Sequence, residues 1–152
     1  MKKFIPFFLI LTLLPVSACY LSLDEGFPSW YPLSEFFDAL NSGRYDDAAE
    51  LFGGSYETLI AMNPEIDPND HAALWKNACE INGFQCLSTR EITSLRETAN
   101  GEMLFLVSFS TDDGDLFVQL LEDGTLVSEF EYHLARGSGN DWGVIDLPVY
   151  VP

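Results

Sequence analysis

The side chains with the greatest potential for chemistry in this chain are its three cysteines and two histidines. Cys79 and Cys86 stand close together, and such a pair of thiols forms a disulfide in an oxidising compartment. The alternative recruits His71 and His133 into a zinc site with two cysteine and two histidine ligands. Because these spacings match no known zinc module, we expect a disulfide that pins the end of a helix to the segment after it.

The first residues of the chain have the organisation of a secretory leader. Two lysines precede an apolar run over residues 4–15, and small residues follow directly before Cys19. A leader of this kind directs the chain out of the cytoplasm, to a compartment where thiols oxidise. The alternative is an uncleaved membrane helix over residues 4–23, which is long enough to span a bilayer. Pro6 and Pro15 argue against that helix, because each would kink it.

The residues that close this leader resemble the lipobox of bacterial lipoproteins: Val16-Ser17-Ala18-Cys19. The resemblance implies that the Cys19 thiol receives a diacylglyceryl group, that a signal peptidase cuts directly before this residue, and that its amine is then acylated. It divides the chain into a signal peptide (residues 1–18), a lipidated N-terminus and spacer (19–32) and a single domain (33–152). The acyl chains would hold the domain at the extracytoplasmic face of a membrane.

Acidic residues dominate the composition, with 24 against 7 basic residues and a formal net charge of −17 at pH 7. Such a surface repels phosphate groups, so we do not expect nucleic acid as a partner. The acid-rich stretches at residues 65–70 and 112–115 offer oxygen ligands for calcium, but neither matches the calcium loop that closes with a glutamate. We therefore interpret them as a helix cap and a β-turn, and we expect no metal and no other cofactor.

The first half of the domain is expected to be helical. Helical periodicity and glycine stops predict helices over residues 34–43 and 45–52 and a further helical turn over residues 56–62. Ser34 is the expected N-cap of the first of these. A fourth helix is expected after a cap at Asp67 or Asn69, with Ile81 at the end of its buried stripe.

The second half is expected to be a meander of about five strands. Alternating apolar residues and turn signals place them at residues 92–98, 102–110, 116–121, 126–136 and 142–150. Asn100-Gly101 is the strongest of the hairpin signals. Helices followed by strands predict an α+β domain, with the helices packed on one face of a curved antiparallel sheet.

Two segments resemble the nuclear transport factor 2-like superfamily, also called SnoaL-like or cystatin-like. Residues 36–52 are similar to its opening helices, and residues 141–145 to its tryptophan-bearing last strand. The resemblance covers residues 33–150 and implies a cone in which a bent sheet wraps around helices. Residues 63–87 depart from the pattern, because they are longer than the expected link and carry the cysteine pair.

That superfamily includes isomerases, cyclases and dehydratases that work inside the cone, and members that only bind or assemble. An isomerase-type site needs an acid as base and tyrosine donors on inward-facing strand positions, and the only strand residues that we nominate for these roles are Asp146, Tyr132 and Tyr150. The more ordinary interpretation places Tyr132 in the core beside Phe130 and Asp146 at a solvated sheet edge.

We therefore expect a membrane-anchored, non-enzymatic domain that binds a small apolar ligand or a protein partner. The alternatives are an enzyme of the isomerase or dehydratase type that uses the cone pocket, and a structural envelope lipoprotein that forms a homodimer through its open sheet face. An enzyme needs inward polar groups with shifted pKa values. A ligand binder needs a roomy apolar cavity, whereas a structural protein has a filled core and an exposed apolar patch.

Overall fold

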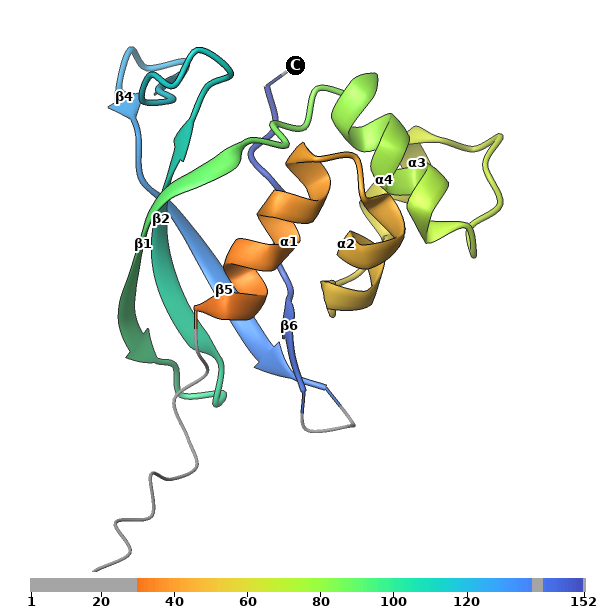
Figure 1. The fold of residues 1–152 in the computed structure, drawn as a ribbon, viewed down its shortest axis with the longest axis horizontal. Helices are drawn as coiled ribbons and strands as arrows, with labels where there is room; N and C mark the ends of the chain where they lie inside the picture. The colour runs from red at the N-terminus through yellow and green to blue at the C-terminus, as the bar shows by residue number, and fades with distance from the viewer. Residues whose placement is uncertain (1–29, 138–140, 152) are drawn as a thin grey trace, which may run out of the picture.

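The computed structural model describes residues 30–137 and 141–151, so the leader and Cys19 lie outside the described residues. Four helices precede the strands, which confirms the α+β class (Figure 1). The elements are α1 (Tyr31–Asn41), α2 (Tyr45–Leu51), α3 (Glu57–Met62), α4 (His71–Glu80), β1 (Ser88–Glu97), β2 (Met103–Ser110), β3 (Gln119–Leu120), β4 (Leu126–Val127), β5 (Phe130–Arg136) and β6 (Trp142–Val144). No helix of this described part is long and apolar enough to cross a membrane.

The main sheet is antiparallel, with the strand order β1-β2-β5-β6. Helix α1 packs against this sheet. Helix α2 packs between α1 and α4, on the side away from β1 (Figure 1). The edge strand β1 has two register shifts, between Thr89 and Glu91 and between Ser94 and Arg96. Such irregularities bend an edge strand and make it a poorer template for further pairing.

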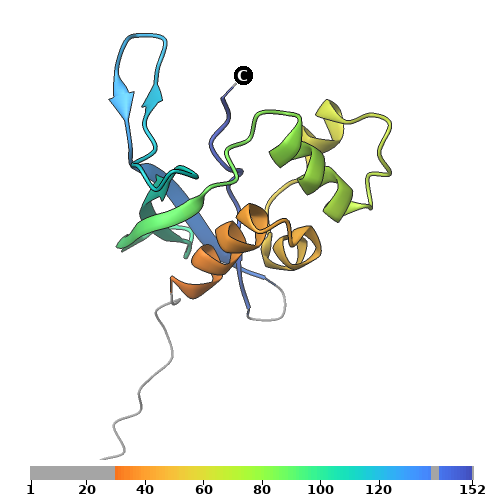
Figure 2. The same cartoon turned by 45° about the horizontal axis from the view of Figure 1, so that its top comes forward.

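The structure differs from the prediction of a single five-stranded sheet. Strands β3 and β4 pair only with each other and form a separate hairpin that projects from the end of the main sheet (Figure 2). Strand β2 pairs directly with β5, for example Phe105 with Tyr132, so the chain between them is free to leave the sheet. The strand expected over residues 142–150 ends at Val144, and Tyr150 makes only an isolated bridge to Phe84.

Aromatic side chains fill the space between α1 and the sheet. The ring of Phe37 lies edge-on to Phe109 and Tyr132, with centroids 4.8 and 4.9 Å away. Phe36 makes a similar contact with Trp75 of α4 at 5.4 Å. Burying a side chain of this size stabilises the fold by about 1.5–3 kcal/mol, so these rings make up much of the core energy.

Two helices begin or end at other residues than the sequence predicts. Helix α1 begins at Tyr31 rather than after Ser34, because Pro32 occupies its first turn, where a missing N–H costs nothing. Helix α4 is capped by Asp70, whose carboxylate accepts the Ala73 N–H at 3.0 Å. The prediction that Ile81 belongs to the buried stripe is wrong, since α4 ends one residue earlier and Ile81 is 70% exposed.

Candidate functional site

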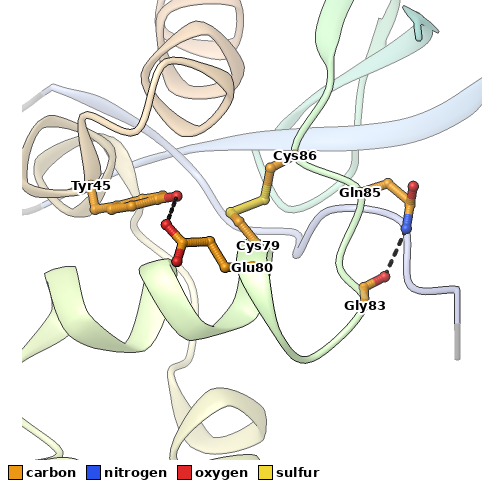
Figure 3. The surroundings of a disulfide bond; sticks show 6 residues. All are labelled: Tyr45, Cys79, Glu80, Gly83, Gln85 and Cys86. Carbon is orange, nitrogen blue, oxygen red and sulfur yellow. Dashed lines mark hydrogen bonds between the residues drawn. A yellow bond between two sulfur atoms is a disulfide. The ribbon is translucent and has the colours of Figure 1, made fainter. Parts of the chain in front are cut away.

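A disulfide joins Cys79 in the last turn of α4 to Cys86, with Cα atoms 5.5 Å apart (Figure 3). The pairing expected from the sequence is therefore present. The pinned loop carries the C-terminal segment, because the Gln85 N–H donates to the Val149 carbonyl at 2.7 Å and the Val151 N–H donates to the Gly83 carbonyl at 3.0 Å. The disulfide thus pins the loop to which the C-terminal segment is hydrogen-bonded.

The two histidines lie apart from these cysteines. His71 begins α4 and stacks on Tyr56 with ring centroids 3.8 Å apart. His133 in β5 contacts Asp146 instead. Among the described residues there is no group of three or more potential metal ligands. Both histidines have contacts that account for their positions.

Tyr132, one of the three pocket residues suggested by the sequence, is a core residue. Its side chain is only 2% exposed and packs edge-on against Phe37 and Phe109. Burial raises the pKa of Tyr132 well above its ordinary value. The backbone N–H of Val149 donates to the phenol oxygen and opposes that rise in pKa, while the charge of Asp146 adds to it. The hydroxyl therefore stays protonated inside the aromatic core.

The other two suggested pocket residues lie nearer the surface. A carboxylate oxygen of Asp146 accepts the backbone N–H of His133 and lies 2.9 Å from its Nδ1 atom. Tyr150 is about half exposed and tilts against Phe84 at 5.3 Å. The structure thus pairs Asp146 with His133, a partner that the sequence did not indicate. None of the three suggested residues lines the groove described below.

Five of the eleven exposed large hydrophobic residues of the described structure lie on the β3–β4 hairpin and its flanks. Leu120 and Leu126, which face each other across the two strands, are 67% and 69% exposed. We define the hairpin surface by the five exposed aliphatic residues of this segment: Leu116, Val118, Leu120, Leu121 and Leu126. Exposed apolar residues gathered on one projecting element are typical of interaction sites.

A groove of about 460 Å³ separates the hairpin from the C-terminal segment. It is lined by residues 117–122 on one side and by Val151 and Gln85 on the other. The amide of Gln119 donates to the Tyr150 carbonyl at 3.1 Å and ties the two sides together. Because Gln85 adjoins the disulfide-bonded Cys86, the wall of the groove is held by the covalent link to α4 (Figure 3).

Acidic residues dominate the charge near the groove. Residues 97–135 contain no lysine or arginine, whereas the hairpin and its flanks carry seven acids: Asp112, Asp113, Asp115, Glu122, Asp123, Glu129 and Glu131. Arg90 in β1 approaches this region and donates to the Gly114 carbonyl at 3.3 Å. Hydrogen bonds from Thr125 lower the pKa of Asp123 and favour its charged form at the hairpin tip. The groove is therefore apolar with a negative rim.

No family model and no curated protein sequence matches this chain.

The strand predicted over residues 116–121 covers only Gln119–Leu120 in the structure, and that prediction does not account for the hairpin surface. One signal was present, because apolar residues occupy successive positions at Phe117-Val118 and Leu120-Leu121. A half-buried strand alternates apolar and polar residues, so apolar side chains on both faces require either a second covering layer or a partner. No such layer covers Leu120 in the described structure.

Proposed function

We propose that this chain is an extracytoplasmic lipoprotein, anchored through Cys19, that acts by binding a partner protein at its hairpin surface. The observation that carries the proposal is the pair of leucines, Leu120 and Leu126, which project into solvent on a hairpin outside the main sheet. Exposing such side chains is unfavourable by about 1.5–3 kcal/mol each relative to burial, and binding a partner recovers that free energy.

The filled core favours a surface function over the two alternatives that use an interior pocket. A small-molecule site or an isomerase-type active site requires room beside inward polar groups. Tyr132, the most deeply placed of the suggested catalytic residues, is instead surrounded by Phe37 and Phe109 and hydrogen-bonded to the Val149 backbone. We therefore place the enzyme alternative second.

The position of the hairpin suits an anchored domain. Helix α1 begins at the end of the molecule opposite to the β3–β4 hairpin in both views (Figures 1 and 2). A lipid anchor upstream of α1 would therefore present the hairpin surface away from the membrane. This geometry supports a partner protein rather than the bilayer as the occupant of that surface.

Kinship with the nuclear transport factor 2-like superfamily is part of the same proposal. It is supported by the order of helices and antiparallel strands and by Trp142 in the last strand. The β3–β4 hairpin, which the resemblance did not imply, would be the feature that adapts this chain to its partner.

The proposal is tested by placing a photo-reactive amino acid at position 120 of the full chain in the cells that produce it. Irradiation is expected to give one discrete adduct of higher mass. The matched control carries the same group at Leu95 of β1, which is also exposed but lies on another element, and it is expected to give none.

A second arm of this experiment tests the anchor. The wild-type chain is expected to incorporate labelled palmitate and to sediment with membranes, whereas Cys19→Ala is expected to do neither. Equal adducts at both positions would contradict the assignment of the hairpin surface, and membrane association of the Cys19→Ala variant would contradict the anchor.

A further inference from the structure

The groove beside β3 has the features of a binding site for an extended polypeptide. Strands β3 and β4 form a two-stranded sheet, so each has an edge without a strand partner in the described chain. An extended peptide can add to such an edge through its main-chain hydrogen bonds. Of the two strands, β3 is the one that lines the groove. Unlike β1, whose two register shifts bend it, β3 and β4 pair in continuous register.

The lining of the groove indicates which side chains such a peptide would place in it. Val118, Leu120 and Val151 contribute exposed apolar side chains from the two walls. Successive side chains of an extended peptide point to opposite faces, so apolar residues at every second position would all enter the groove. Gln85, Gln119 and Glu122 are its polar lining residues, and the amide of Gln119 is already bonded to the Tyr150 carbonyl.

The charge distribution indicates the residues between those apolar positions. Glu122 lines the groove and Asp123 stands at the adjoining turn. With no lysine or arginine between residues 97 and 135, nothing on the hairpin itself neutralises them. Basic side chains on the peptide would meet this negative rim at short range, whereas acidic ones would be repelled.

From these three observations we infer that the groove between the β3–β4 hairpin and the C-terminal segment binds an extended partner segment in which apolar and basic residues alternate. The inference rests on the proposed function and specifies the chemistry of the partner. A second copy of this chain fits poorly, because it would bring two acidic hairpins together. Anionic lipid headgroups are disfavoured for the same reason.

The test uses the full-length protein in phosphatidylcholine nanodiscs and a fluorescein-labelled octapeptide of alternating valine and lysine, followed by fluorescence anisotropy. Saturable binding is expected. Alternating valine–glutamate and serine–lysine octapeptides serve as controls for charge and for apolar content, and both are expected to bind at least about tenfold more weakly. Empty nanodiscs correct for binding of the peptide to lipid.

Two surface variants localise the binding. Leu120→Ser is expected to weaken binding of the valine–lysine peptide about tenfold or more, and Leu95→Ser is expected to leave it unchanged. Both side chains are exposed, so neither substitution removes a core contact, and circular dichroism of each variant checks the fold.

Several outcomes would overturn the inference. Equal binding of the serine–lysine and valine–lysine peptides would show a non-specific charge effect, and an unchanged affinity in Leu120→Ser would place binding elsewhere. Self-association lost in Leu120→Ser would assign the groove to a second copy, and Leu120-dependent binding to phosphatidylcholine vesicles would assign it to lipid. A cross-linked adduct at position 120 without peptide binding would leave the proposed function standing and reject only this inference.

Discussion

At the scale of single residues, the burial of Tyr132 makes the stability of the protein depend on pH. Burial raises its pKa above the ordinary value of 10.0, so at alkaline pH the folded protein keeps a proton that the unfolded chain loses. Ionisation of Tyr132 therefore leaves the free energy of unfolding unchanged below about pH 10. Above that pH it lowers the free energy of unfolding by up to about 1.4 kcal/mol per pH unit. Tyr132→Phe is expected to flatten that slope, measured by urea unfolding between pH 7 and 11.

A core variant without an ionisable group separates this effect from loss of packing. Phe109→Leu is expected to lower the free energy of unfolding by a similar amount at every pH, because it changes contacts and no proton. Tyr45 and Tyr56 also have raised pKa values through burial, so part of the alkaline slope should remain in Tyr132→Phe. A slope identical to that of the wild type would show that Tyr132 ionises alike in both states.

The same residues show what single-residue reasoning can foresee. Alternation along β5 placed Tyr132 on the apolar face with Phe130 and Leu134, and the structure buries it there. The contact between His133 and Asp146 was not foreseeable in this way. It depends on the register of β5 against β6, which pairs Leu134 with Val144, and no local pattern encodes that register.

At the scale of elements, the disulfide links α4 to the wall of the groove. Replacing both cysteines by serine is expected to lower the free energy of unfolding by about 2.5 kcal/mol, the value for closing so short a loop. Amide exchange at Gln85 and Val151 should also quicken, since their hydrogen bonds depend on the pinned loop. Urea unfolding and hydrogen exchange measure these two effects.

Wild-type protein in reductant is the matched control, and it should behave like the double variant. Amides in the middle of α1 should quicken only as far as the loss of global stability requires, because that helix packs on the sheet, whereas Gln85 and Val151 should quicken more. Equal stability of the oxidised and reduced proteins would show that the noncovalent contacts alone hold the loop.

The elements also mark the limit of what the sequence could predict. The helices were predictable because their periodicity and glycine stops are local, and α2 and α3 begin and end within about two residues of their expected positions. The expected caps were wrong, since α1 begins without a side-chain cap and Asp70 caps α4. The hairpin was not, because alternation describes the pleat of a strand and says nothing about which sheet it joins. Because β2 pairs directly with β5, residues 116–127 have no place between them in the main sheet.

At the scale of the whole molecule, the excess of acids acts on folding and on binding in opposite senses. With 24 acidic and 7 basic residues, the compact state is destabilised by repulsion between like charges. Salt screens that repulsion, since the screening length falls from about 30 Å at 0.01 M to about 8 Å at 0.15 M ionic strength. The folded protein should therefore gain stability from salt.

The inferred peptide complex has the opposite dependence, because its attraction between basic side chains and the acidic rim is screened by the same ions. Raising sodium chloride from 10 to 300 mM is expected to raise the melting temperature by about 4 °C, if screening recovers about 1 kcal/mol, and to weaken binding of the valine–lysine peptide. Scanning calorimetry and anisotropy on the same samples measure both quantities, and sucrose at equal osmolality controls for effects other than screening. Affinity and stability that rose together would show that the peptide is held by apolar contacts alone, and the negative rim would then have no part in selecting the partner.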